Sequence, residues 1–202
     1  TTLKVLSGIL YPTSGDINVL GFNPEEREAA FKKQFGIVMG QKEQLFKVLP
    51  PMDSFLLFKA IYEISDTEFA DTLEELTTLL DVKSILNVPV KNLSLGQRMK
   101  CELIGALLHK PKMLFLDEPT IGLDGVAQKN IRDFIQKYNR EKKTTIILTS
   151  HYMDDIKELC ERVIIINFGK IIYDGKLADL ISTYAKDKVI KVSTTESIPK
   201  EA

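Results

Sequence analysis

The feature that most constrains this 202-residue chain is a pair of short segments, residues 93–98 and 113–120. The first reads Leu-Ser-Leu-Gly-Gln-Arg, in which a serine and a glutamine three positions later form the pattern of a helix capping box. The second is an apolar run that ends in two adjacent carboxylates, Asp117 and Glu118. A continuous apolar run is typical of a strand buried on both faces, and open α/β sheets bind their ligands at the carboxyl ends of such strands. We therefore expect a helix to begin near Ser94 and a buried strand to end at the carboxylates of Asp117 and Glu118.

Capping explains Ser94 and Gln97 but leaves Gly96 without a reason. Glycine near a helix start costs roughly 1 kcal/mol relative to alanine, and it suits a place where another group approaches the backbone closely. A helix N-terminus with a bare backbone and a serine hydroxyl can bind an anion. Two interpretations of this segment follow, a purely local cap and an anion-binding helix start.

Strands alternate with helices along the rest of the chain, which indicates βαβ units and a largely parallel sheet. Apolar runs or apolar–polar alternation predict strands at 16–20, 35–39, 113–117, 145–149, 163–167 and 170–173. Helical spacing predicts the end of a helix in 1–10, and helices at 25–34, across 46–109, at 126–142 and at 153–161.

Composition excludes several classes of protein. Apolar residues make up 44% and charged residues 27% of the chain, which is ordinary for a globular protein. The 27 basic and 28 acidic residues nearly cancel, so a strongly basic nucleic-acid-binding face is not expected. Cys101 and Cys160 lie far apart without metal-ligand spacing, and we interpret them as reduced core residues in preference to a zinc site or a disulfide. No apolar run approaches the ~20 residues that span a bilayer, so membrane work would need another chain or segment.

The order and spacing of the two opening segments resemble those of ABC-type ATPases. Residues 93–98 resemble the signature motif, with Leu95 where the family usually has glycine, and residues 113–118 resemble the Walker B strand. The resemblance extends from residue 1 to about 185. It implies an α/β fold of the P-loop NTPase type, with a mostly parallel sheet flanked by helices, an inserted helical subdomain and part of an antiparallel β subdomain.

The same resemblance implies a domain organisation. An ATPase core would be formed by residues 1–45 and 110–185, and a helical signature subdomain by residues 46–109. Residues 186–202 would begin a C-terminal extension or tail.

It also implies a role for each site residue. Asp117 would hold Mg²⁺ through water, and Glu118 would polarise the attacking water as general base. His151 would be the switch histidine that hydrogen-bonds the γ-phosphate. Gln41, with Phe46 five residues later, would be the Q-loop glutamine that ligates Mg²⁺ and reports the nucleotide state to the helical subdomain. Taken alone, two carboxylates at a strand end or one histidine are more often solvated or core groups; His109 is interpreted in that way.

The signature segment would act on a neighbouring molecule. The resemblance implies that Ser94, Leu95, Gly96 and Gln97 bind the γ-phosphate of ATP held by a second, facing subunit. Asp124, in Gly122-Leu123-Asp124, would be the D-loop aspartate at the subunit interface.

One expected motif does not occur within the 202 residues, since no Gly-x-x-x-x-Gly-Lys-Ser/Thr sequence is found. In the family this phosphate-binding loop precedes a helix that resembles residues 1–8, so we expect it directly upstream of Thr1. Its backbone cradle and lysine provide most of the phosphate affinity. We therefore expect the chain as given to bind ATP poorly and to be inactive.

The function implied is that of an ATP-binding and ATP-hydrolysing subunit of an ABC transporter, with ATP and Mg²⁺ as cofactors. Its partners would be a second ATP-binding subunit, as a homodimer, and a separate integral membrane permease; it would lie in the cytoplasm, peripheral to the inner face of the cell membrane. Residues 38–42 and 95–100 resemble bacterial ATPases of ABC-2-type exporters, which favours export.

Two alternatives remain open. The first is a soluble ABC-type module in DNA repair or translation, although the chain has no long coiled-coil insertion and no second cassette. The second is a degenerate regulatory cassette, although Glu118 and His151 are both present. No nucleic-acid partner is expected.

Overall fold

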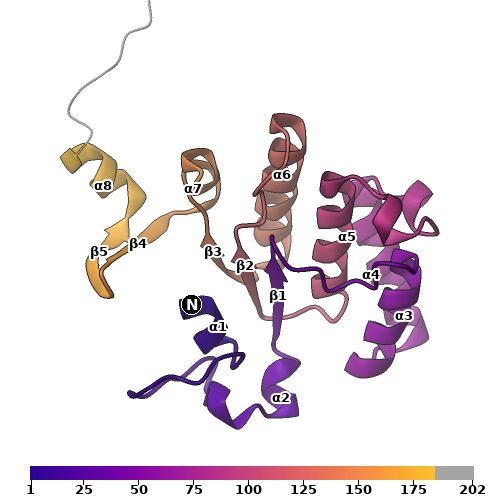
Figure 1. Cartoon of the computed structure of the whole chain (residues 1–202), viewed down its shortest axis with the longest axis horizontal. Helices are drawn as coiled ribbons and strands as arrows, with labels where there is room; N and C mark the ends of the chain where they lie inside the picture. Colours follow the sequence, from indigo (N-terminus) through magenta and orange to yellow (C-terminus); the bar gives the residue numbers. More distant parts are fainter. Residues whose placement is uncertain (185–202) are drawn as a thin grey trace, which may run out of the picture. The chain divides into compact units, whose positions relative to one another are not determined.

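The computed structural model describes residues 1–184 and divides the chain into two compact units, Thr1–Leu159 and a second unit that begins at Cys160. The first unit is built on a parallel sheet of β1 (Phe35–Met39), β2 (Met113–Asp117) and β3 (Thr145–Thr149), in the order β1-β2-β3. Figure 1 shows these strands side by side. In the register, Met39, Asp117 and Thr149 lie opposite one another, so the three carboxyl ends meet at one edge of the sheet.

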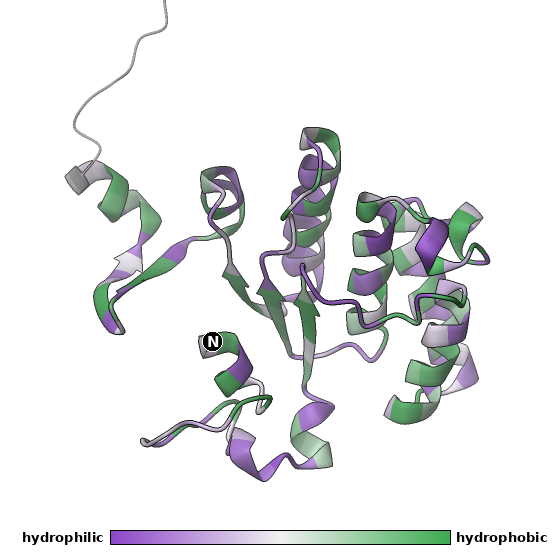
Figure 2. Ribbon diagram, in the orientation of Figure 1, coloured by the Kyte–Doolittle hydropathy of each residue, from purple (hydrophilic) through white to green (hydrophobic). Residues whose placement is uncertain are grey.

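Side chains alternate between the two faces of the sheet along each strand, and both faces are covered. Leu114 and Leu116 of β2 belong to a large core cluster on one face, while Met113 and Phe115 belong to a smaller cluster on the other. The strands are accordingly coloured as hydrophobic in Figure 2. The predicted strands 35–39, 113–117 and 145–149 are confirmed.

Seven α-helices surround the sheet in the first unit. They are α1 (Thr2–Leu6), α2 (Ala29–Lys32), α3 (Pro51–Tyr62), α4 (Asp66–Leu80), α5 (Leu95–Leu107), α6 (Gly125–Lys142) and α7 (Met153–Leu159). Short 3-10 turns occupy Pro24–Glu26, Lys83–Ile85 and Val90–Asn92. Among the residues described, no helix has the length and apolarity to cross a lipid bilayer.

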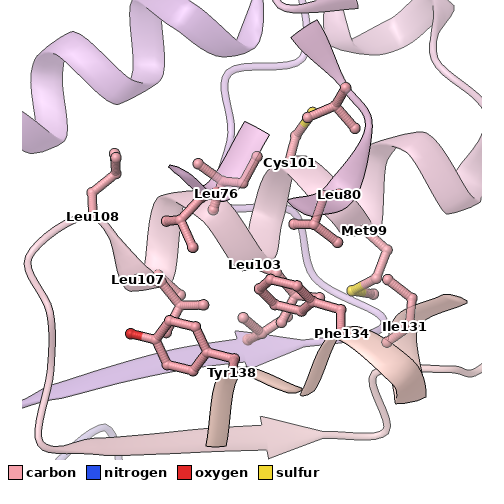
Figure 3. Close-up of a cluster of buried hydrophobic side chains, with 14 of the residues drawn as sticks. Leu76, Leu80, Met99, Cys101, Leu103, Leu107, Leu108, Ile131, Phe134 and Tyr138 are labelled. Atoms are coloured by element: carbon pink, nitrogen blue, oxygen red, sulfur yellow. The ribbon is translucent and has the colours of Figure 1, made fainter. Parts of the chain in front are cut away.

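The large core cluster joins α4, α5 and α6. Figure 3 shows Phe134 and Tyr138 of α6 beside Leu103 and Leu107 of α5, with Leu76 of α4 close by. All five side chains are at least nine-tenths buried. The helical segment that contains α3 to α5 therefore shares one core with α6 and the sheet.

The predicted strand at 16–20 is wrong. Val19 forms an isolated bridge with Phe22, across a turn in which Leu20 and Gly21 have left-handed φ angles of 54° and 88°. Among the residues described, no strand pairs with this segment. The apolar–polar alternation at 16–20 therefore leads into a tight turn and does not form a strand of a sheet.

The two N-terminal helices are shorter than predicted. The first ends at Leu6, because Gly8 takes a φ of 73° and lies so close to Pro24 that an added Cβ would meet its carbonyl oxygen at 2.4 Å. Within the predicted helix 25–34, Arg27 has a φ of 51°, which separates a 3-10 turn from α2.

The second unit contains β4 (Arg162–Asn167), β5 (Lys170–Lys176) and α8 (Leu177–Tyr184). The strands form an antiparallel hairpin around Phe168 and Gly169, whose φ angles of 44° and 74° suit a two-residue turn. Arg162 donates two hydrogen bonds of 2.7 Å to Asp174 across the hairpin. This hairpin confirms the antiparallel part of the expected fold. The tail predicted at 186–202 lies outside the described residues.

Candidate functional site

The candidate site lies at the edge of the sheet where the parallel strands end. Backbone hydrogen bonds continue one residue past the strands, since Gly40 donates from its N to the Asp117 carbonyl at 2.8 Å and Glu118 donates to the Thr149 carbonyl at 2.9 Å. The segments that follow β1, β2 and β3 therefore leave the sheet from fixed, neighbouring positions.

Asp117 is held by the neighbouring strand. Its Oδ1 accepts a hydrogen bond of 2.6 Å from the hydroxyl of Thr149, the residue opposite it in the register. The side chain is half-buried at the strand end, so a carboxylate oxygen is presented in a fixed direction. Carboxylate oxygen is the ligand type that Mg²⁺ prefers.

Glu118 leaves the strand in a left-handed conformation, with a φ of 54°. Its Oε2 is buried and accepts no hydrogen bond from the residues described. The Nδ1 atom of His151 lies 2.7 Å from this oxygen, a contact that becomes an ion pair when the imidazole is protonated. The structure thus brings together the two residues for which we predicted catalytic roles.

Gln41 follows the first strand, and its side chain is exposed. Its position is fixed through Gly40, where an added Cβ would lie 2.1 Å from the carbonyl oxygen of Glu118 and 2.8 Å from Ile121. The turn that carries Gln41 is therefore packed directly against the backbone that follows β2. Phe46, predicted as the accompanying aromatic, is about half exposed.

The capping box predicted at the start of α5 is confirmed. The Gln97 backbone donates to Ser94 Oγ at 3.2 Å, and the Ser94 backbone donates to Gln97 Oε1 at 2.9 Å. Ser94 is nevertheless exposed. A Cβ on Gly96 would lie 3.0 Å from the Cβ of Ala127, so within this chain the group that approaches Gly96 closely is α6.

Asp124 has a local role that the sequence analysis did not identify. It is the N-cap of α6, and its Oδ1 accepts a hydrogen bond of 2.9 Å from the Ala127 backbone. The side chain of Leu95 would meet a Cβ on Gly122 at 3.2 Å. The start of α5 and the segment before α6, which were predicted as signature and D-loop, are therefore neighbours within one chain.

A buried polar network behind the site was also missed. Asp155 of α7 is 0% exposed and accepts hydrogen bonds from the hydroxyls of Thr120 and Ser150 and from Arg132 Nη1. Arg132 also donates from Nε to Glu158 at 2.9 Å. Nothing in the local sequence distinguishes Asp155 from an ordinary acidic residue on a short helix.

Glu102 is a second buried carboxylate that the sequence analysis missed. Its Oε1 accepts backbone hydrogen bonds from Gln44 at 3.0 Å and Leu45 at 3.3 Å, which tie the segment after Gln41 to α5. Burial raises the pKa of Glu102 in spite of these two donors.

Within residues 1–184, no three His, Cys, Asp or Glu side chains converge as a metal-binding group. A Mg²⁺ ion bound with nucleotide needs only one or two protein oxygen ligands, because phosphates and waters complete its coordination. Asp117 and Gln41 are suitable donors of this kind.

Comparison with known families decides the identity of the fold. The family model described as ABC transporter matches residues 1–121, more than half of the chain. The chain belongs to the ABC transporter family. The family predicted from the motifs is thereby confirmed, together with the mixed α/β P-loop NTPase fold and its ATP-binding character.

Individual members of the ABC transporter family align over most of the chain. The ABC transporter ATP-binding protein NatA of Bacillus subtilis is 33% identical over 180 residues, which cover 89% of this chain and 73% of NatA. The linearmycin resistance ATP-binding protein LnrL of the same organism is 29% identical over 195 residues, or 96% of this chain and 62% of LnrL. The chain thus spans about two thirds of the length of these relatives.

A solved structure shares the fold. It is a dimeric ATP-binding cassette in a post-hydrolysis state, bound to ADP and Pi, and it superimposes with a TM-score of 0.75 at 21% identity. The alignment covers 87% of this chain and 79% of that chain.

Proposed function

We propose that this chain is an ATP-binding and ATP-hydrolysing subunit that powers transport, in the direction of export, through a separate membrane permease. The observation that carries the proposal is the meeting of Asp117, Glu118 and His151 at the ends of two adjacent parallel strands. Membership of the ABC transporter family supplies the reaction class, and the three side chains supply groups suited to it.

Asp117 and Gln41 would hold Mg²⁺ together with the phosphates of ATP. When bound, Mg-ATP supplies the γ-phosphoryl group and neutralises the charge that develops during its transfer. The hydrogen bond from Thr149 fixes Asp117 before nucleotide binds, so the carboxylate need not reorganise.

Glu118 would take a proton from the attacking water at Oε2. This atom lies 2.7 Å from Nδ1 of His151 at the edge of the sheet, so the expected base and the expected phosphate-contacting ring stand side by side. The exposed ring of His151 would donate a hydrogen bond to the terminal phosphate at the same edge of the sheet.

The signature segment would complete the site of a second copy. Ser94 and Gly96 lie at a helix start that can bind an anion, where Gln97 fixes the backbone through the capping box and Leu95 lies between them. Asp124 is exposed close to this segment. Two copies arranged head to tail about a two-fold axis would then form two composite sites. The helical segment 46–109 would transmit closure to a permease, which would keep the protein at the inner face of the cell membrane.

The test uses the protein in its full natural length, carrying Glu118→Gln. Light scattering with and without Mg-ATP should show monomers converting to dimers on addition of nucleotide. Adding Ser94→Asp to the same protein should prevent the conversion, because aspartate can still cap α5 while its negative charge repels the phosphate. A protein that binds ATP and remains monomeric would rule out the homodimer.

Attachment to a permease is tested separately. In membrane fractions of the host, the complete protein should sediment with the membranes and should be released by alkaline carbonate, as expected for a peripheral subunit. Recovery of all the protein in the supernatant at physiological salt would argue against coupling to a permease.

A further inference from the structure

We propose that Asp155 is a positioning residue for hydrolysis, which holds the loops carrying Glu118 and His151 in register through one buried carboxylate. This inference rests on the proposed ATPase function. Asp155 would not touch nucleotide or water; it acts through the two residues named.

The geometry places Asp155 between both loops. Its Oδ2 accepts hydrogen bonds from the hydroxyl of Thr120, in the loop after β2, and from the hydroxyl of Ser150, in the loop after β3, the latter at 2.7 Å. Its Oδ1 accepts from Arg132 Nη1 of α6 at 3.2 Å. One side chain on α7 therefore joins two loops and a second helix.

The anchor points lie next to the reacting groups in the sequence. Thr120 is two residues after Glu118, and Ser150 directly precedes His151. Ser150 Oγ also accepts a hydrogen bond of 3.0 Å from the backbone N–H of Tyr152, so the same hydroxyl is linked to the residue that follows His151. Because Thr120 and Asp155 are both 0% exposed, neither anchor can move without disturbing close-packed neighbours.

The charges around Asp155 explain why a carboxylate is required. A buried carboxylate must be paired, and it can only accept hydrogen bonds. Two hydroxyls and one guanidinium supply three donors that converge on it. Burial disfavours the charge of Arg132, but the hydrogen bonds and charges of Glu158 and Asp155 outweigh this effect and raise its pKa. An asparagine at position 155 would turn an amide N–H₂ toward one of these donors.

The consequence is geometric control of the site. Glu118 and His151 each lie within two residues of a hydroxyl that donates to Asp155. Their atoms Oε2 and Nδ1 are 2.7 Å apart. A misplacement of about 1 Å can lower a rate ~10²-fold while binding persists. Loss of the anchor should therefore lower kcat more than it changes KM for ATP.

The experiment measures steady-state ATP hydrolysis by the protein in its full natural length. Asp155→Asn, Thr120→Val and Ser150→Ala should each lower kcat, by roughly 10- to 100-fold for Asp155→Asn, while KM stays within about twofold. Thr120→Ser and Ser150→Thr keep a hydroxyl and should restore most of the rate. Glu158→Gln is the matched control, because it removes the charge of the other, exposed partner of Arg132 and leaves all three bonds to Asp155.

A second readout separates positioning from a general loss of structure. The chain has only two histidines, so the imidazole NMR signals of His109 and His151 can be resolved. In the Thr120→Val and Ser150→Ala proteins, the signal of His151 should shift or broaden while that of His109, half-buried beside Tyr62, stays in place. If Asp155→Asn fails to fold, these two variants carry the test.

Two results would overturn the proposal. One is a Thr120→Val, Ser150→Ala double variant with the kcat of Glu158→Gln and an unchanged His151 signal. The other is displacement of both histidine signals, or a KM effect as large as the kcat effect, since either indicates a general structural role. A wild-type protein without ATPase activity would defeat the proposed function instead, and the NMR comparison would still test the anchor.

Discussion

The imidazole Nδ1 of His151 lies 2.7 Å from Oε2 of Glu118 across the ends of two neighbouring strands. That oxygen is buried, although the Glu118 side chain as a whole is about one-third exposed. The imidazole beside it is about half exposed, so the pair can meet water or a ligand at the edge of the sheet. The pair therefore supplies a proton acceptor and a hydrogen-bonding ring at one point of the sheet edge.

Replacing Glu118 with glutamine should stop hydrolysis and spare ATP binding. The amide keeps the size of the side chain but cannot take a proton, and general base catalysis contributes about 10²–10⁴-fold to a rate. Phosphate release should fall by at least ~100-fold while the Kd for a fluorescent ATP analogue changes little. Asp154→Asn removes an exposed carboxylate on α7 and serves as the control. A Glu118→Gln protein with the control's rate would assign the base elsewhere.

Adding a methyl group at Gly40 should destabilise the protein. Its Cβ would lie 2.1 Å from the Glu118 carbonyl oxygen, a clash with backbone that cannot rotate away. Overpacking of this kind costs about 1–3 kcal/mol. Gly125→Ala is the comparison, because nothing lies within 4 Å of its added Cβ at the first residue of α6, and it should be neutral or more stable by up to ~1 kcal/mol. Urea unfolding of both variants measures the difference, and equal stabilities would contradict the packing described.

His109 should make the protein less stable in mild acid. Burial lowers its pKa, the ring stacks on Tyr62 at 3.9 Å, and Nε2 lies 3.0 Å from the carbonyl oxygen of Phe35. The unfolded chain, with an ordinary histidine pKa of about 6.5, takes up a proton before the folded chain does. The stability from the neutral ring is thus complete above about pH 6.5 and is lost as the pH falls toward the lower folded pKa, by at most ~1.4 kcal/mol per pH unit.

The measurement compares free energies of unfolding at pH 7.5 and 5.5 for wild type and His109→Gln. Other groups titrate equally in both proteins, so the difference between them isolates His109. Wild type should lose more stability than the variant on acidification. A loss of the same size in both would show that the ring titrates freely in the folded state.

Cys101 should resist alkylation in the folded protein. It is 0% exposed, and desolvation, helped by the charge of Glu102, raises its pKa to about 12. Since the thiolate is the reacting form, both access and reactivity are low. In a Cys160→Ala protein, in which Cys101 is the sole cysteine, iodoacetamide at pH 8 should label the thiol in urea and leave it unmodified in buffer. Rapid labelling in buffer would mean that the core in Figure 3 opens readily.

The sheet and α6 could be predicted because their burial follows from the spacing of apolar residues along the chain. Met113 to Leu116 are apolar without interruption, as a central strand requires, and Ile131, Phe134, Ile135 and Tyr138 recur at helical spacing. The strand predicted at 16–20 failed because alternation alone does not supply a partner strand. There, two left-handed residues fold the chain back on itself.

The placement of three candidate site residues could also be predicted from the sequence. Asp117 ends β2, Glu118 directly follows it and His151 lies two residues after β3, and parallel strands bring such positions together. Asp155 and Glu102 were missed because their role is decided by distant partners. Arg132 of α6 makes a buried carboxylate tolerable in one case, and the backbone N–H groups of 44–45 do so in the other. The spacing of residues along the chain does not predict those contacts, because the partners are far apart in the sequence.

The left-handed backbone of Glu118 sets stability against activity at a single position. A φ of 54° costs a residue with a side chain about 1 kcal/mol that glycine avoids. Glu118→Gly should therefore make the fold more heat-resistant while removing its proton acceptor. Directed evolution that screened only for thermal tolerance would drift toward that change, and an ATPase assay would have to accompany every round to retain the glutamate.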